Sequence, residues 1–565
     1  MSLYSSIRLA ANALRANQIG LQVVGQNIAN ADTPGYIRAE AVLVPAPPQR
    51  IGKLLLGTGV EVQAVVQKID QFLEERFRRS VSDRVDAETQ ESTYLQLEAV
   101  IGELGDADLS TAMDNFFSSI AEILNQPESD SVRNLAVLQG STLTSDVNRL
   151  AGRVGEIRSG LNDRVIGMVG NINRLIEEIR KLNVQITVTE GGDVSASDAA
   201  GLRDQRLHAL EDLAELISIR VKEQPDGSVV VYSGGDFLVF QGVSREVEVQ
   251  LESDRGLAAA ELYLAETDAP LRPASGQLAG LLAARDGITG GFLDRLDEFA
   301  RTLAFEFNKL YSGGQGLRGF QELTGEFAVT ADDLALNQAG LEFTPVNGSL
   351  QVMVHDKNSD TTQTTDVLVD LNGLGNDTTL ADLATMLTAI DGITAAITSE
   401  GKLTISSESS QQEFAFAGDT SGVLAALGLN TFFSGSSASS LGVSEVLRED
   451  PAKFAASRGG IAADTENAVD LAAFLDRPIP SRSGLSLTAL YDGMMAQTAQ
   501  ASSVAQSTAE GARTFEDTLR GQKLALSGVN LDEEAVRMIA LQRSFQAAAR
   551  YIAALAELLE MVVNL

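Results

Sequence analysis

The two ends of the chain carry the pattern that decides the fold. Residues 3–28 read LYSSIRLAANALRANQIGLQVVGQNI, and residues 538–562 read MIALQRSFQAAARYIAALAELLEMV. In both stretches the apolar residues recur at alternating steps of three and four, the repeat of helices that pack against other helices. The N-terminal seam consists of Leu3, Ile7, Ala10, Leu14, Leu21, Val24 and Ile28, with Asn17 in the same row. The C-terminal seam consists of Met538, Leu541, Phe545, Ala548, Ile552, Leu555, Leu559 and Val562.

Both seams are predicted to be buried against other helices, since one helix cannot cover its own apolar row. Helices paired inside an ordinary bundle would explain one such stretch. Two of them at opposite ends favour a protein that assembles with copies of itself, because chain ends are otherwise the parts that fray.

Composition narrows the class of protein. The chain has 565 residues, 44% of them hydrophobic, and a net charge of −34, which argues against nucleic acid and membrane as partners. Residues 1–50 carry +2 and residues 521–565 carry −1, so the remainder carries −35. Chain ends with almost no net charge are suited to helices packed against other copies of the chain. The strongly acidic remainder is suited to contact with water. The absence of cysteine excludes disulfides, thiol catalysis and thiolate metal sites.

The middle of the chain is predicted to be helical over long stretches. From Leu143 to Ile186 the apolar residues again alternate by three and four, with one irregular step after Leu161. A helix of that length would extend about 65 Å, which favours an elongated domain over a compact enzyme. Hairpins are expected at Asp226-Gly227 and Gly234-Gly235, and helix again over Gly276–Tyr311.

Residues 321–450 differ from the rest. They are rich in Thr, Ser, Asp and Gly, contain short alternating runs, and hold three basic residues against nineteen acidic ones. We expect an inserted, mostly β domain that splits a helical domain, followed by a flexible linker at Ser434–Ser440. The fold class is therefore predicted to be mainly α with β insertions, elongated and multidomain.

Enzyme motifs find no supporting context. The literal G-x-G-x-x-G at Gly314–Gly319 follows a helix, not a strand, so we interpret it as a flexible helix exit. Residues 356–367 open like a calcium loop but have Thr361 in place of the turn glycine and Val367 in place of the bidentate glutamate. We expect no catalytic residues, no cofactor and no metal.

Three motifs, in order, resemble the bacterial flagellar rod, hook and hook-associated proteins. The first is Asn27-Ile-Ala-Asn30-Ala-Asp-Thr-Pro34-Gly35-Tyr36, the second is Gly57-Thr-Gly-Val-Glu-Val62 with Asp70-Gln-Phe-Leu73, and the third is Ser527-Gly-Val-Asn530-Leu531-Asp-Glu533-Glu534. Asn530 is a good N-cap with Glu533 at capping-box spacing. The stretches Leu202–Arg206, Gly276–Asp286 and Phe307–Gly314 narrow the resemblance to the FlgK type of hook-associated protein.

This resemblance implies three domains. Residues 1–56 and 521–565 would form a terminal coiled-coil domain of an inner tube. Residues 57–320 and 450–520 would form a helical body with β-hairpins near 218–265, and residues 321–449 an acidic, β-rich outer domain.

The resemblance also implies a function: a structural adaptor of the bacterial flagellum that joins hook to filament by helical self-assembly. The implied partners are other copies, the hook protein, the next hook-associated junction protein on the filament side, and a cytosolic export chaperone at the C-terminal helix. The implied location is extracellular, reached by export of the unfolded chain. This agrees with an N-terminus that lacks the apolar core of a cleaved signal peptide.

Two alternatives stay open. A secreted binding protein or adhesin would use the 321–449 domain to hold its ligand. A cytosolic enzyme is the weaker alternative, because no catalytic constellation is found.

Overall fold

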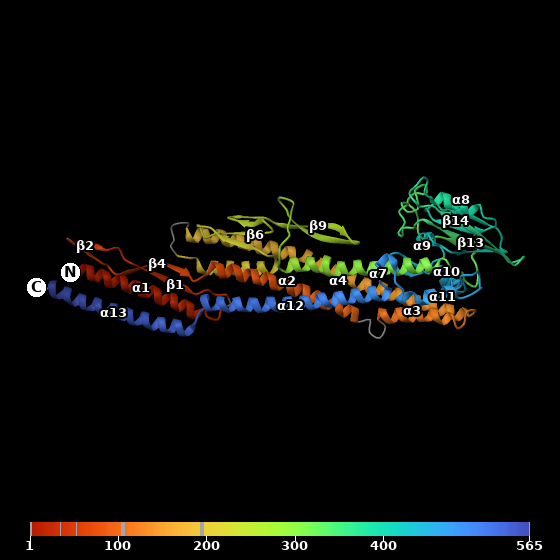
Figure 1. The fold of residues 1–565 in the computed structure, drawn as a ribbon. Coiled ribbons are helices and arrows are strands. Elements are labelled where there is room, and N and C mark those ends of the chain that lie inside the picture. Colours follow the sequence, from red (N-terminus) through yellow and green to blue (C-terminus); the bar gives the residue numbers. More distant parts are fainter. Residues whose placement is uncertain (1–2, 34, 52, 103–107, 192–196, 564–565) are drawn as a thin grey trace. The chain divides into compact units, whose positions relative to one another are not determined.

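The computed structural model describes residues 3–33, 35–51, 53–102, 108–191 and 197–563 (Figure 1). The chain forms two compact units. Unit 1 comprises Met1–Thr93, Ser159–Arg285 and Ser503–Leu565, and unit 2 comprises Tyr94–Arg158 and Asp286–Ser502. The helices α2 (Gln71–Gly102), α4 (Asp130–Glu190) and α12 (Leu487–Ser527) contribute residues to both units. The predicted class, mainly α with β insertions, is confirmed, and the expected long helix from Leu143 to Ile186 lies within α4.

In the described part of unit 1, helices combine with four small antiparallel sheets, whose strand orders are β1-β4, β2-β3, β5-β6-β7-β8 and β11-β10-β9. Its remaining elements are α1 (Leu3–Ala29), β1 (Ala39–Pro45), β2 (Gln49–Ile51), β3 (Leu54–Leu56), β4 (Val60–Gln67), α5 (Ala200–Leu216), β5 (Arg220–Glu223), β6 (Val229–Ser233), β7 (Asp236–Phe240), β8 (Val243–Ser244), β9 (Val247–Asp254), β10 (Leu257–Leu264), β11 (Ala269–Pro270), α6 (Gln277–Leu282) and α13 (Leu531–Val563). Both hairpins expected from Asp226-Gly227 and Gly234-Gly235 are present.

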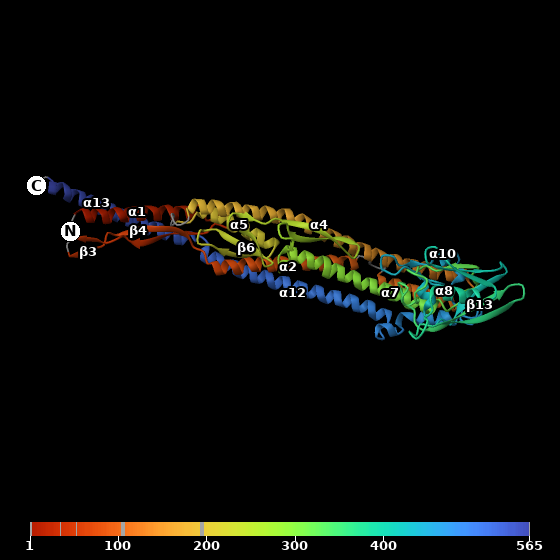
Figure 2. The ribbon, with the colours of Figure 1, turned by 90° about the horizontal axis from the view of Figure 1, so that it is seen from above.

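The terminal helices α1 and α13 lie side by side, as Figures 1 and 2 both show. Asn17 donates to Ser544 at 3.1 Å, and Asn27 donates to Glu534 at 3.1 Å. Between these two contacts, Gly20 packs on Leu541. From Asn17 to Asn27 the residue number rises by ten along α1, while that of the partner on α13 falls by ten. The two helices are therefore antiparallel.

Asparagine side chains on the helices hold the strands of unit 1. Asn183 of α4 donates to the Val229 carbonyl and accepts from the Val229 N–H, at 2.8 and 3.0 Å. Asn173 makes the same pair of bonds to Val247, at 2.8 Å each. Asn162 bridges Ala258 and Ala260 of β10, and Asn27 of α1 binds Ala39 of β1. Each asparagine amide thus pairs with one backbone N–H and one backbone carbonyl of a strand that lies against a helix.

Unit 2 surrounds an aromatic core. Its other elements are α3 (Leu109–Ile123), α7 (Gly290–Tyr311), β12 (Glu322–Thr324), β13 (Gly348–Asp356), β14 (Thr361–Val369), α8 (Leu380–Thr388), β15 (Ile393–Ile397), β16 (Leu403–Ser407), β17 (Gln412–Ala417), α9 (Val423–Leu427), β18 (Phe433–Ser434), β19 (Gly442–Val443), α10 (Glu445–Glu449) and α11 (Glu466–Ala472). Phe116 of α3 lies 5.6 Å from Phe307 of α7 and 5.0 Å from Phe432, measured between ring centroids. The ring of Phe474, which follows α11, lies 5.6 Å from that of Phe307. Segments before and after the insert therefore share one core with it.

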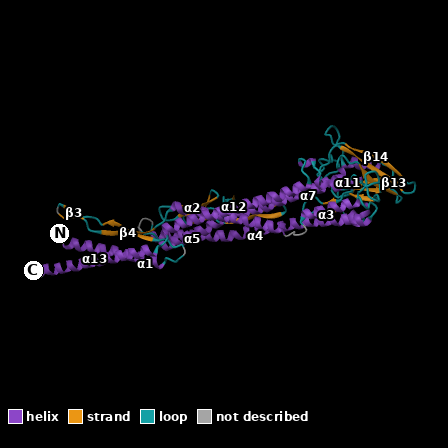
Figure 3. Ribbon diagram, turned by 60° about the horizontal axis from the view of Figure 1, so that its bottom comes forward, coloured by secondary structure: helices purple, strands orange, loops and turns teal. Residues whose placement is uncertain are grey.

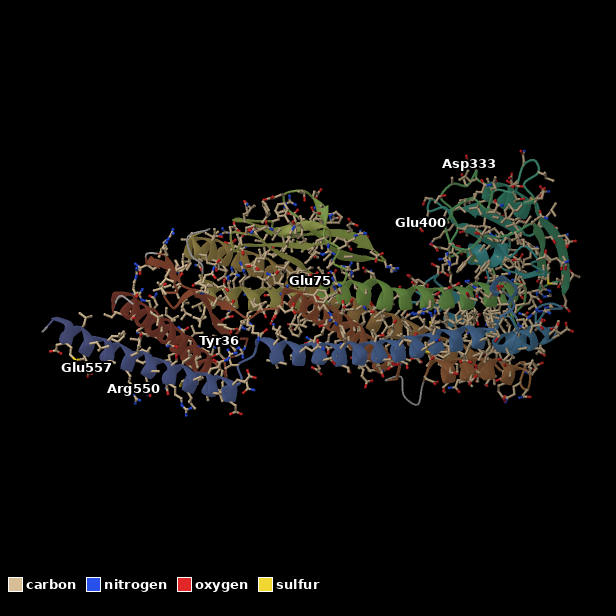
Figure 4. All side chains as sticks on the ribbon, turned by 60° about the vertical axis from the view of Figure 1, so that its left-hand side comes forward. Tyr36, Glu75, Asp333, Glu400, Arg550 and Glu557 are labelled. Carbon is tan, nitrogen blue, oxygen red and sulfur yellow. The ribbon has the colours of Figure 1, made fainter. Side chains whose placement is uncertain are left out.

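The insert within unit 2 has a core of its own. The sheets β14-β13-β17 and β12-β16-β15 pack with α8 and α9 around Leu350, Val352, Leu383 and Phe416, all at most 2% exposed. Figure 3 shows strands gathered here around β13 and β14. Asp333 and Glu400 lie on its surface, as Figure 4 shows. The sheets and the acidic surface residues are features that the sequence predicted for this insert.

Two predicted flexible segments are packed instead. Residues 434–440 form a turn between β18 and β19 in which Ala438 is fully buried and donates its N–H to Asp297 at 2.7 Å. Its carbonyl accepts from Asn148 at 2.8 Å. The high serine content was misleading here, because distant side chains form hydrogen bonds with the backbone of the turn and order it. The Gly314–Gly319 segment is likewise ordered: an added Cβ at Gly316 would lie 2.7 Å from the Ala452 carbonyl, so close packing explains that glycine.

Candidate assembly site at the chain termini

The structure places the two seams against each other in part. Ala10 and Val24 are buried, and Ile7, Leu14, Leu21 and Ile28 are half-buried. On α13, Leu555 is 7% exposed, and Met538, Leu541, Ala548 and Ile552 are half-buried. Phe545 and Leu559 stay exposed. The side chains of Leu3 and Val562 lie outside the described residues.

The two terminal helices are covered to different extents. Besides α13, helix α1 contacts β1 and β4, and Asn12 donates to the Thr58 carbonyl at 3.0 Å in the second motif. Helix α13 contacts α1 on one side. Two further stripes of α13 are exposed, which distinguishes it from a helix of an ordinary bundle.

The first exposed stripe, which we name the outer stripe, is mainly apolar or small and consists of Val536, Ala540, Ala547, Tyr551, Ala554 and Leu558, with Arg543 at its edge. Val536 is 68% exposed. The second, the polar stripe, consists of Gln542, Gln546, Arg550, Glu557 and Glu560. Ile539, which is 51% exposed, and Ala553 lie in the same row. Figure 4 shows Arg550 and Glu557 pointing away from the rest of the chain. With the covered stripe, α13 thus has three distinct sides.

The first and third motifs meet at one end of the α1–α13 pair. Asn27 accepts a hydrogen bond from the Tyr36 hydroxyl at 3.0 Å and donates to Glu534 at 3.1 Å. Arg38 donates to Glu533 at 3.2 Å, and its backbone N–H donates to the Ser527 carbonyl at 2.9 Å. We name Asn27, Tyr36, Arg38, Glu533 and Glu534 the terminal knot.

Glu534 is the buried charge of the knot. It is 0% exposed, and its Oε1 atom lies 3.8 Å from a guanidinium nitrogen of Arg38 and 3.8 Å from one of Arg537. A buried carboxylate is tolerated only with such partners. Asn530 caps α13 as predicted, accepting from the N–H groups of Asp532 and Glu533. The Glu533 carboxylate, which was expected to complete a capping box, binds Arg38 instead.

Gly35 and Tyr36 connect the knot to α5. Gly35 has φ +72°, and an added Cβ would lie 1.9 Å from the His208 ring, so both conformation and space require glycine. Burial raises the pKa of the Tyr36 hydroxyl, and the nearby Asp204 and Glu534 carboxylates raise it further. Burial also raises the pKa of Asp204, which accepts from Gln67 of β4 at 2.7 Å.

The stretch Leu202–Arg206 joins the terminal strands to the helical body. Arg203 donates to Glu190 at 2.7 Å and to Glu223 at 2.6 Å. Arg206 is buried and binds Asn183 at 2.9 Å, and burial lowers its pKa to about 10. The motif therefore has a structural explanation.

The remaining motif residues lie outside the knot. Asn30 donates to the Gln26 carbonyl within the last turn of α1, and Leu531 is exposed at the start of α13. Pro34 lies outside the described residues. Sequence reasoning missed Arg38 and Ser527 as partners, because the contact joins positions almost 500 residues apart.

No metal-binding group of three or more His, Asp or Glu side chains occurs in the part of the chain that the structure describes. A search of the described helices for a stretch long and apolar enough to cross a membrane found none.

Comparisons with known proteins agree with the terminal motifs and the helical middle. The model of the flagellar hook-associated protein FlgK helical domain matches residues 94–327. The models of the flagellar basal body rod FlgEFG protein C-terminal region and of the flagella basal body rod protein match residues 520–565 and 7–36.

Curated relatives cover more of the chain. Flagellar hook-associated protein 1 of Bacillus subtilis is 24% identical over 431 residues, which are 69% of this chain and 82% of that protein. The protein of the same name from Escherichia coli is 22% identical over 594 residues, covering 99% and 100%. The flagellar hook junction protein FlgK of Burkholderia pseudomallei has a TM-score of 0.49 at 14% identity, covering 80% of this chain and 100% of that one.

The helical-domain match spans α3, α4 and α7, and the rod-protein matches span most of both helices of the terminal pair. The two curated relatives share one name. Over its helical middle and at both ends, the chain is similar to the FlgK-type flagellar hook-associated proteins.

Proposed function

We propose that this chain is a structural adaptor that joins the flagellar hook to the filament by helical self-assembly. Its curated relatives are hook-associated proteins, which are structural parts of the flagellum. The observation that carries the proposal is the exposed outer stripe of α13.

The outer stripe needs a partner that one copy does not supply. Tyr551 is 44% and Leu558 47% exposed, and both lie on a helix whose other apolar side is covered by α1. Apolar surface of this kind gains about 25 cal/mol per Å² when it is removed from water. In an assembly, the α1–α13 pair of the next copy is the natural cover, and a contact between different faces can repeat from copy to copy along a helix.

The polar stripe suits a different surrounding. If each outer stripe is covered by a neighbour, Gln546, Arg550 and Glu557 remain in contact with water. A tube of terminal helices lined by this stripe would let polar, unfolded chains pass without adhering. We propose this inner tube for residues 1–56 and 521–565, a helical body for 57–320 and 450–520, and the outer position for 321–449.

The finer parts of the proposal concern export and partners. We propose that the chain leaves the cell without signal cleavage, and that a cytosolic chaperone holds the C-terminal helix beforehand. The outer stripe supports a chaperone, since exposed apolar rows promote aggregation. The hook protein and the next junction protein are the proposed neighbours, and we propose no catalytic activity.

Electron microscopy of a deletion strain tests the adaptor function. We expect hooks without filaments in the deletion strain and hooks with filaments when the wild-type gene is restored. Filaments of normal number on the deletion strain would refute the proposal.

A further inference from the structure

Unit 1 contains a basic groove in a strongly acidic chain. It is a hollow of about 820 Å³ between α2, β5, the Gly234-Gly235 turn and the loop after β11. Its lining includes the cations Arg79, Arg220, Lys222 and Arg272, and one carboxylate, Asp83. In a chain of net charge −34, four cations around one hollow require an explanation.

The cations of the groove are mostly without counter-ions. Arg79 lies 3.5 Å from Glu75 on the exposed side of α2. Arg220, Lys222 and Arg272 are exposed, and no carboxylate among the described residues lies within 4.0 Å of them. These three cations are therefore available to a carboxylate of a binding partner.

The groove is held in shape by backbone bonds. Ser218, before β5, donates its N–H to the Ser275 carbonyl at 2.9 Å, and its hydroxyl accepts from the N–H of Ala274 at 3.0 Å. Gly276 donates to the Ser82 carbonyl of α2 at 3.0 Å. The loop carrying Arg272 is thereby fixed beside Arg220 despite their like charge. A site built before binding loses less entropy when its partner arrives.

The same unit presents a row of carboxylates. Glu246, Glu248 and Glu252 are exposed. Glu248 and Glu252 lie four residues apart on β9, the last strand of its sheet, and Glu246 directly precedes that strand. Side chains an even number of residues apart in a strand lie on one face, so Glu248 and Glu252 share a face at a separation of about 13 Å. We name these three residues the acidic row. Arg220 and Lys222 likewise share one face of β5, so the row and the groove each present like charges along a strand and are opposite in sign.

We propose that the groove of one copy binds the acidic row of a second copy. The inference rests on the proposed self-assembly and adds to it a specific contact of unit 1. Within one copy, no carboxylate of the row forms an ion pair with a groove cation in the described structure. Two complementary and different patches on each copy are what an open helical assembly requires.

Charge reversal on each side tests the contact in the full-length protein. R220E/K222E reverses the groove, E248K/E252K reverses the row, and the four-fold variant carries both. Each one-sided variant should lower the fraction of hooks bearing filaments at least about tenfold, because like charges then face each other. The four-fold variant should recover most of that loss.

Control variants separate charge from position and folding. R164E/R174E makes the same charge change on exposed positions of α4 and should leave the filament count unchanged. Circular dichroism and the amount of secreted protein should be unchanged in every variant. A milder pair, R220Q/K222Q, should lower the filament count less and abolish its sensitivity to salt.

A carbodiimide cross-link identifies the occupant directly. On isolated hook–junction complexes assembled from isotopically light and heavy copies, Lys222 should link to Glu248 or Glu252 of the other isotope. K222R should keep its filaments and lose the link.

Normal filament counts with R220E/K222E would overturn the proposal. So would a four-fold variant that is not rescued, or cross-links from Lys222 to another partner only. None of these results would affect the proposed adaptor function, provided that the wild-type gene restores filaments to the deletion strain.

Discussion

The insert and the C-terminal helix are opposite solutions to burying apolar residues. The insert closes around its own core, with Leu350 and Val352 at most 1% exposed. Helix α13 leaves Val536, Tyr551 and Leu558 in water and covers only the side that faces α1. The difference indicates that the insert is complete in one copy, whereas the terminal pair is completed by other copies.

The largest expected effect comes from a charge in the outer stripe. Y551D or L558D should abolish filament formation, because each assembled copy would bury an unpaired carboxylate at a cost of several kcal/mol. L555D should do the same through the covered stripe. Circular dichroism of the secreted chain should show an intact body.

Q546D on the polar stripe is the matched control, since it adds the same charge to the same helix at a position expected to face water. If Y551D and Q546D had equal effects on filament counts, the three-sided interpretation of α13 would be wrong.

Arg38 in the terminal knot should rank next. R38A removes one of the two guanidinium groups near the buried Glu534 and should cost terminal folding about 3 kcal/mol. Filament counts on a complemented deletion strain should fall strongly. E534Q in the same chain should restore part of the loss, and R8A, on the exposed side of α1, should be neutral.

Deleting residues 330–428, which keeps Phe432 in the shared aromatic core, and joining the ends by a short Gly/Ser linker should have an intermediate effect. The insert is absent from both seams, and loop-closure entropy grows slowly with length. Swimming should be reduced but present in a strain that exports the shortened chain. If the shortened chain were secreted but the strain did not swim at all, the insert would carry the function, and the adhesin alternative would be favoured.

The smallest effect concerns pH and Tyr36. Its pKa is raised in the folded state, so above pH about 10 the unfolded form releases a proton that the folded form retains. Tyr36 therefore disfavours terminal folding increasingly as pH rises. Y36F should lose about 1 kcal/mol at neutral pH with the Asn27 hydrogen bond, and should show a flatter decline of filament stability above pH 10.

A Y36F variant that lost filaments at the same alkaline pH, and with the same slope, as the wild type would remove Tyr36 from this account. Filament release followed by light scattering gives both values.

Periodicity predicted the helices well, because a helix of this kind depends mainly on residues near it in sequence. The periodic stretch from Leu3 to Ile28 lies within α1, and the stretch Leu143–Ile186 lies within α4. The hairpin turns were also local signals. Side-chain bonds between distant segments leave no such pattern, so the asparagine contacts and the Arg38–Glu533 pair were not predicted.

Composition was a weaker guide than periodicity. Ser434–Ser440 and Gly314–Gly319 looked flexible by content, yet they are fixed by Asp297, Asn148 and neighbouring carbonyls. The seams remain a prediction as assembly contacts, because the surface they are expected to meet belongs to other copies.

Hydrogen exchange along α13 tests the central claim most directly. The full-length protein would be compared as a dilute, verified monomer and as isolated hooks carrying the junction. We predict fast exchange over residues 536–558 in the monomer, since a helix packed on one side only is marginally stable. In the assembly the same amides should slow at least about a thousandfold. Protection of α13 in the monomer, or fast exchange in both states, would contradict the account.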